Sequence, residues 1–120
     1  MAVSKVLCVD DASADLINLE KIVASTGLIV LTANSGKVAL AMAKHDKPDL
    51  IFLDISMPDM DGFAVMRELK RDADLKDIPV VLITSKSQKA DKMWAKMQGA
   101  KGYVTKPYTA AQIIEQISSF

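Results

Sequence analysis

The chain has 120 residues, half of them hydrophobic and a quarter charged, which is typical of one globular domain with its own core. Fifteen basic residues balance fifteen acidic ones, so no strong net field favours nucleic acid or an anionic membrane as a partner. No hydrophobic run approaches the roughly 20 residues of a membrane span, and no secretory leader is recognisable. We therefore expect a cytoplasmic protein that neither contacts nucleic acid directly nor inserts into a membrane.

The first part of the chain is predicted to alternate between strands and helices. A buried strand is expected at Val6–Val9, and a helix follows it with Ser13 as its N-cap and Gly27 at its end. A second strand is expected at Leu28–Leu31, and a second helix is built around Val38 and its alanine neighbours. These segments form two strand–helix units.

The same alternation continues to the C-terminus. Strands are expected at Leu50–Leu53, Val80–Ile83 and Tyr103–Val104. A third helix follows Gly62, which is expected to supply a permissive backbone at the turn. A fourth helix contains Met93, which is predicted to lie in the core, and a fifth helix ends the chain.

Five strands alternating with five helices predict an α/β fold in which a parallel sheet is covered on both faces. The strands are almost continuously Val, Ile and Leu, which agrees with burial on both sides, and the lone Cys8 is expected to be a small buried hydrophobe. Right-handed crossovers favour a doubly wound five-stranded sheet of order 2-1-3-4-5. One such domain uses all 120 residues, so no output domain is expected.

The carboxyl ends of the predicted strands carry the polar residues of greatest interest. Asp10 and Asp11 follow the first strand, Asp54 the third, Thr84 the fourth, and Lys106 the fifth. In open α/β sheets the functional crevice lies beyond these ends, where the strand order reverses. We therefore expect three carboxylates, a hydroxyl and an ammonium to meet at one rim of the sheet.

This set of groups has a specific chemical use. Three carboxylates without His or Cys suit Mg²⁺, which prefers hard oxygen ligands together with water and phosphate. A carboxylate can attack phosphorus to give an aspartyl phosphate, and a metal ion and a lysine can balance the charge on the transferred group. Asp54 is the expected nucleophile because its strand is central, and Asp10 and Asp11 are expected to hold the metal.

Each residue also has a simpler interpretation when it is taken alone. Asp10 and Asp11 would be typical of residues that cap the following helix and favour its dipole. Asp54 would be typical of a turn, Thr84 of a strand end, and Lys106 of a solvated loop. The functional interpretation rests on their predicted convergence at one rim.

Four motifs in the sequence resemble those of two-component response-regulator receiver domains. They are "VDDAS", "LDISMPDMDGF", "LITSKS" and "GAKGYVTKP", and they occur in the order and spacing of that family over the whole chain. The stretch "SKSQKADKMWAKMQGAKGYVTKP" is similar to that of single-domain regulators in twitching-motility and chemotaxis-like pathways. The resemblance implies the CheY-like, flavodoxin-like form of the predicted fold.

The resemblance also implies a role for individual residues. Asp54 matches the phosphoacceptor, and Asp10 and Asp11 match the acidic pair that binds Mg²⁺. The remaining matches are the backbone carbonyl of Ser56 as a metal ligand, Thr84 and Tyr103 as the switch pair, Lys106 as the partner of the phosphoryl group, and a cis Lys106–Pro107 peptide bond.

A stand-alone phosphoacceptor follows from this resemblance. It would receive a phosphoryl group from a sensor histidine kinase or a histidine phosphotransfer protein, and would hydrolyse it slowly without being an enzyme in the usual sense. Phosphorylation would alter the surface of the fourth helix, fifth strand and fifth helix, which offers Trp94, Met97, Tyr103 and Tyr108 to an unknown partner protein. For Trp94, core packing and partner contact are equally compatible with the pattern.

Other functions are weighed against this one. A flavin mononucleotide carrier would share the strand order, but Asp10 and Asp11 would repel its phosphate. The sequence pattern of aspartate-nucleophile phosphatases has a second Asp two residues after the nucleophile, and this chain has Ser56 at that position. A phosphate sink for a shared kinase, and a constitutive interaction module that is never phosphorylated, remain alternatives within the receiver family.

Overall fold

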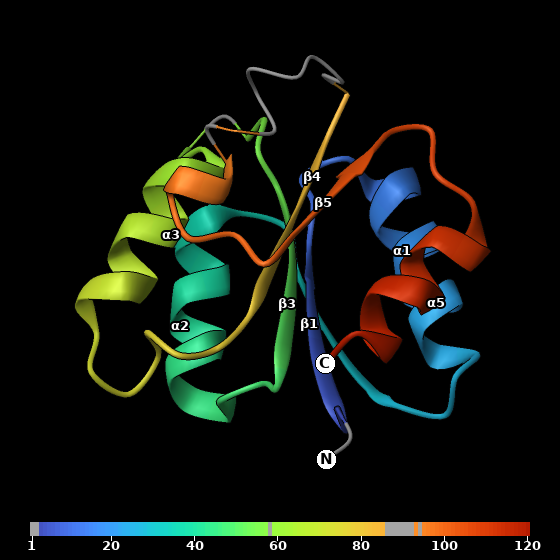
Figure 1. Ribbon diagram of the computed structural model, residues 1–120, viewed down its shortest axis with the longest axis horizontal. Coiled ribbons are helices and arrows are strands. Elements are labelled where there is room, and N and C mark those ends of the chain that lie inside the picture. Colours follow the sequence, from blue (N-terminus) through green and yellow to red (C-terminus); the bar gives the residue numbers. More distant parts are fainter. Residues whose placement is uncertain (1–2, 58, 86–92, 94) are drawn as a thin grey trace.

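The computed structural model describes residues 3–57, 59–85, 93 and 95–120. Its centre is a five-stranded sheet, seen edge-on in Figure 1. The strands are β1 (Lys5–Val9), β2 (Ile29–Ala33), β3 (Leu50–Asp54), β4 (Val80–Thr84) and β5 (Gly102–Thr105). All neighbouring pairs are parallel and the order is β2-β1-β3-β4-β5, which confirms the predicted topology.

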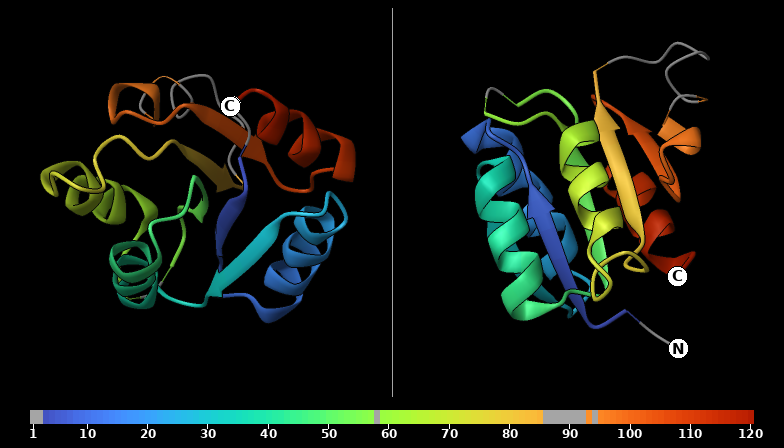
Figure 2. Two further views of the ribbon diagram at one scale, coloured as in Figure 1. Left: turned by 90° about the horizontal axis from the view of Figure 1, so that it is seen from below. Right: turned by 90° about the vertical axis from the view of Figure 1, so that its left-hand side faces the viewer.

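Helices cover both faces of the sheet. They are α1 (Ser13–Ala24), α2 (Gly36–Asp46), α3 (Gly62–Arg71) and α5 (Ala110–Ser118). Residues 93 and 95–97 are also helical and belong to the predicted fourth helix. α2 and α3 lie on one side of the sheet, and α1 and α5 on the other (Figures 1 and 2). No helix among the described residues is long and apolar enough to cross a membrane.

Alternating side chains of the central strands enter two separate hydrophobic clusters. In β1, Leu7 and Val9 join the cluster that contains residues of α2 and α3, whereas Val6 and Cys8 join the one that contains residues of α1 and α5. β3 and β4 are divided between the clusters in the same way. Because both faces are buried, every position of these strands gains free energy from an apolar side chain, about 1.5–3 kcal/mol for each large one.

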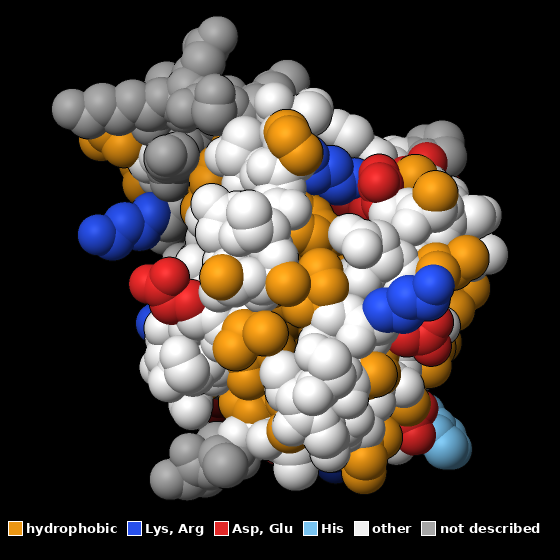
Figure 3. Space-filling model, turned by 90° about the vertical axis from the view of Figure 1, so that its right-hand side faces the viewer, with side chains coloured by type: hydrophobic (Ala, Val, Ile, Leu, Met, Phe, Trp, Pro, Cys, Tyr) orange, Lys and Arg blue, Asp and Glu red, His pale blue; other side chains and the backbone are white. Residues whose placement is uncertain are grey.

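Helices α1 and α5 bury some of their hydrophobic side chains and expose others. Ile113 of α5 is fully buried, whereas Ile114 beside it is exposed. One residue corresponds to a rotation of about 100° around a helix, so adjacent residues cannot face the sheet equally. Ile17 of α1 is exposed as well. Hydrophobic side chains accordingly reach the surface on this side of the molecule (Figure 3).

The prediction that Met93 lies in the core is wrong. Its exposed fraction is 58%, that of Met97 is 76%, and Ala95 between them is 1% exposed. Met93 and Met97 are each two residues from Ala95, so each lies roughly 200° around the helix from it. The small Ala95 therefore takes the buried position, and both methionines face solvent.

The predicted start of α1 also needs correction. Ser13 is the first helical residue rather than the N-cap, which is Ala12. Asp10 Oδ1 accepts a hydrogen bond from the Ala12 backbone N–H at 2.9 Å. The Asp10 carboxylate thus supports the turn between β1 and α1, whereas no side chain among the described residues caps the start of α1, so Asp10 does not cap this helix.

Gly62 is required for close packing rather than for an unusual backbone conformation. Among the described glycines only Gly27 and Gly99 have positive φ. A Cβ atom on Gly62 would lie 2.8 Å from the Asp54 carbonyl oxygen and 2.8 Å from the Ile55 Cα. The missing side chain lets the start of α3 lie directly against the end of β3, next to Asp54.

We expect Gly62→Ala to lower the free energy of unfolding by about 1–3 kcal/mol, because the added methyl group meets backbone atoms that cannot rotate away. Urea unfolding measures the change. In open space the same substitution inside a helix stabilises by up to about 1 kcal/mol, so a variant as stable as the wild type would contradict the packing argument.

Candidate functional site

Three carboxylates meet at the upper rim of the sheet, as predicted. Asp10 and Asp11 follow β1, and Asp54 ends the neighbouring strand β3, where Val9 is paired with Leu53. One oxygen atom from each carboxylate lies within 4.8 Å of the other two. Asp10 and Asp54 are almost fully buried and Asp11 is exposed. The parallel strands therefore place the acids in one cluster that opens to solvent.

Asp54 lies in an environment that opposes its negative charge. Burial, and then repulsion from Asp10, raise the pKa of Asp54 from the ordinary 3.8 to about 6. A hydrogen bond from the Ser56 backbone N–H to Asp54 Oδ1, 3.1 Å long, acts in the opposite direction. The carboxylate is held in place by its neighbours but is only partly compensated.

Lys106 supplies the positive charge. Its Nζ atom lies 2.8 Å from Asp10 Oδ2, 2.9 Å from Asp15 Oδ2 and 3.4 Å from Asp54 Oδ2. Burial by itself would lower the pKa of Lys106, but the hydrogen bonds to Asp10 and Asp15 raise it above the ordinary value. The Lys106–Pro107 peptide bond is cis, as predicted. The ammonium binds two carboxylates closely and makes only a long contact to Asp54.

Asp15 is a member of the site that sequence reasoning missed. It lies in the first turn of α1, and its contact with Lys106 joins residues 91 positions apart. An acid in a first helical turn is usually explained by the helix dipole, so the sequence contains no separate signal for this ion pair. The contact exists because α1 packs on the same side of the sheet as the segment that follows β5.

A second missed residue, Asp59, anchors the loop between β3 and α3. Its two carboxylate oxygens accept hydrogen bonds from the backbone N–H groups of Gly36 and Lys37, each at 3.2 Å. These bonds satisfy donors at the start of α2 and lower the pKa of Asp59. Met57 of the same loop is buried in the core. The loop that carries Ser56 is therefore held to the body of the domain.

Thr84 and Tyr103 share one face of neighbouring strands. Thr84 ends β4 in a buried position, and Leu82, two residues earlier, is paired with Tyr103 of β5. Tyr103 packs against the hydrophobic cluster on the α2 and α3 side. Since residues two apart in a strand point to the same face, Thr84 lies on the Tyr103 side of the sheet. The two residues of the predicted switch pair therefore lie on the same face of neighbouring strands, and their role as a switch stays a prediction.

Residues 6–118 match the sequence pattern of the response regulator receiver domain. The chain belongs to the response-regulator receiver family. It is therefore a receiver domain of two-component signalling. Domains of this family take phosphoryl groups from histidine kinases or phosphotransfer proteins.

Full-length and partial relatives are both similar to this receiver domain. PilH of Pseudomonas aeruginosa is 37% identical over 116 residues, which cover 97% of this chain and 96% of PilH. The response regulator PleD of Caulobacter vibrioides is 40% identical over 116 residues, but these cover only 26% of PleD. Among solved structures, the Vibrio cholerae chemotaxis protein CheY4 is 29% identical, with a TM-score of 0.91 over 98% of both chains.

The acidic cluster fits a magnesium ion, which receiver domains generally bind. All three candidate side chains, Asp10, Asp11 and Asp54, offer carboxylate oxygens, the ligand type that Mg²⁺ prefers. Burial and repulsion from Asp10 both oppose the negative charge of Asp54, and a divalent cation among the three carboxylates would offset both effects. The role of the Ser56 carbonyl as a further ligand stays a prediction.

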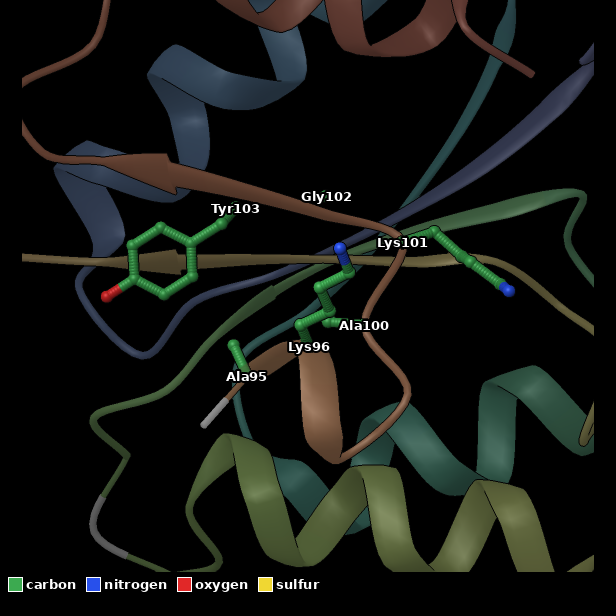
Figure 4. A pocket seen from close by; sticks show the side chains of 6 residues that line it. All are labelled: Ala95, Lys96, Ala100, Lys101, Gly102 and Tyr103. Carbon is green, nitrogen blue, oxygen red and sulfur yellow. The ribbon is translucent and has the colours of Figure 1, made fainter. Parts of the chain in front are cut away.

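The residues of the predicted partner surface do not all lie on one side of the sheet. Met97 is exposed, and Tyr103 lines a groove of about 270 Å³ with Ala95, Lys96, Ala100, Lys101 and Gly102. In Figure 4 the Tyr103 ring projects from β5 beside this groove. Tyr108 instead packs against the cluster on the α1 and α5 side. Trp94 lies outside the described residues.

Proposed function

We propose that this receiver domain accepts a phosphoryl group on Asp54 from the phosphohistidine of a sensor kinase or phosphotransfer protein, in a reaction that requires Mg²⁺. The observation that carries the proposal is the position of Asp54, which ends the central strand β3, lies in one cluster with the buried Asp10 carboxylate, and is 3.4 Å from the Lys106 ammonium. Sequence similarity to PilH and structural similarity to the chemotaxis protein CheY4 support a role in motility or chemotaxis-like control.

Three side chains of the protein would take part in phosphoryl transfer. An Asp54 oxygen forms the new bond to phosphorus, the bond from phosphorus to the donor imidazole nitrogen breaks, and the imidazole keeps the electron pair. Lys106 is close enough to pair with the incoming phosphoryl oxygens, and Thr84 can donate a hydrogen bond from the next strand. When bound by Asp10, Asp11 and Asp54, Mg²⁺ would supply further positive charge.

The output would follow from the switch pair. A phosphoryl group on Asp54 would draw the Thr84 hydroxyl toward it, and Tyr103 would move into the space that Thr84 leaves. Their shared face of β4 and β5 supports this coupling. The groove beside Tyr103 would change shape, and with it the affinity for a partner protein. Slow hydrolysis of the acyl phosphate would reset this cytoplasmic switch.

Phosphorylation by acetyl phosphate tests the proposal directly. Intact-protein mass spectrometry is expected to show one added phosphoryl group on the wild type with Mg²⁺ and none with a chelator. Asp54→Asn is expected to abolish the adduct, and the exposed Asp74→Asn is the matched control, which should be labelled like the wild type. Full labelling of Asp54→Asn would overturn the assignment of the phosphoacceptor.

A further inference from the structure

The ion pair between Asp15 and Lys106 has no part in the chemistry described above. Asp15 Oδ2 lies 2.9 Å from Lys106 Nζ, nearly as close as Oδ2 of the buried Asp10, which lies 2.8 Å from it. Yet Asp15 is not in the three-carboxylate cluster that could hold a metal ion. We propose that Asp15 is a positioning residue, which retains the Lys106 ammonium at the rim when a divalent cation occupies the cluster. This inference rests on the proposed magnesium-dependent function.

The argument begins with competition between two cations. Among the described residues, three carboxylates contact Lys106 Nζ, and two of them, Asp10 and Asp54, also belong to the candidate metal cluster. A divalent ion among these acids would repel the ammonium and would compete with it for the carboxylates of Asp10 and Asp54. Asp15 is then the one carboxylate of the ammonium's three partners that stays available to it. A lysine without that partner would be free to turn away from the phosphoryl position.

The surroundings of Lys106 leave room for its ammonium to shift toward Asp15 when a divalent ion binds. A pocket of about 430 Å³ lies on the Asp15 side of Lys106 and is lined by Asp15, Asn18, Ser85, Lys106, Pro107 and Tyr108. The Asp15 side chain is 49% exposed and that of Lys106 is 21% exposed, whereas that of Asp10 is 3% exposed. The ammonium can therefore move outward along Asp15, which is fixed in the first turn of a helix rather than in a loop.

Loss of any nearby acid would weaken cation binding to some extent, so the test must separate positioning from net charge. Positioning requires Lys106, and the effect of net charge does not. Magnesium affinity is therefore measured calorimetrically in the wild type, Asp15→Asn, Lys106→Met and the double variant. Glu20→Gln, an exposed acid on α1, reports the general effect of one lost charge.

We expect Asp15→Asn to weaken Mg²⁺ binding by about 3–10-fold in the presence of Lys106, and by less than about 2-fold in the Lys106→Met background. Asp15→Glu should keep affinity near that of the wild type, and Glu20→Gln should have little effect. Equal effects of Asp15→Asn in both backgrounds would overturn the positioning role while leaving the proposed function intact. Absence of Mg²⁺ binding by the wild type would overturn both.

Discussion

Near pH 8 and without Mg²⁺, the Asp54→Asn variant is expected to be more stable than the wild type by about 2–3 kcal/mol. The pKa of Asp54 is raised from 3.8 to about 6 in the folded protein, chiefly by burial and then by Asp10. Each pKa unit corresponds to about 1.4 kcal/mol, so the folded state loses about 3 kcal/mol when this carboxyl ionises. Asparagine has the same shape without the charge.

The pH dependence has a definite sign. Between about pH 4 and pH 6 the folded protein binds more protons at Asp54 than the unfolded chain does, so stability falls as the pH rises through this range. Near pH 4 the folded carboxyl is protonated and the unfolded one is becoming so, and most of the advantage of Asp54→Asn should therefore be lost. Urea unfolding from pH 4 to pH 8 in a chelator measures this, with Asp74→Asn as the exposed control. A variant less stable than the wild type at pH 8 would show that the contact with Lys106 outweighs burial and repulsion.

Lys106→Met is expected to have the opposite effect, lowering stability by about 2–4 kcal/mol near pH 8 without metal. Its removal takes away the ammonium that contacts the buried carboxylates of Asp10 and Asp54, which form no other ion pair within the described part of the chain. Removing one partner from a buried ion pair costs about 3–5 kcal/mol, and partial exposure of the lysine reduces this figure. Because the pKa of Lys106 is raised, its contribution is fully present below pH 10.5 and is lost only as the pH rises through the folded-state pKa.

Urea unfolding with and without Mg²⁺ separates charge from packing in this variant. If the loss comes from uncompensated carboxylates, millimolar Mg²⁺ should restore most of it, because the ion replaces the missing ammonium. The exposed Lys76→Met serves as control and should change stability by less than about 0.5 kcal/mol. A loss in Lys106→Met that Mg²⁺ leaves unchanged would point to packing of the lysine side chain instead.

Most of the fold could be predicted from local patterns. The apolar runs identified all five strands because each central strand is buried on both faces, and their order followed from the handedness of crossovers. Errors occurred where one turn of a helix decides exposure. Met93 looked like a core residue, but the neighbouring Ala95 occupies the buried side. Ser13 looked like a cap, but the Asp10 side chain supports that turn instead.

Some residues of the candidate site could likewise be predicted from the sequence, and others could not. Asp10, Asp54 and Lys106 could be assigned to one rim because parallel strands bring their carboxyl ends to the same edge. Asp15 and Asp59 could not, since each acts on a segment distant in the sequence, Lys106 in one case and the start of α2 in the other. Acids in a helical turn or a loop have many local explanations, so only their partners reveal what they do.

The sequence by itself determined the sheet, its order, and the five polar side chains at its rim, because these depend on periodicity and on residues at strand ends. Tertiary structure alone decided how the charges are shared. It placed the Lys106 ammonium close to Asp10 and Asp15 and farther from Asp54, and it raised the pKa of Asp54 through burial. Charge sharing depends on distances between separate elements and on exclusion of water, and neither is encoded in the spacing of residues along the chain.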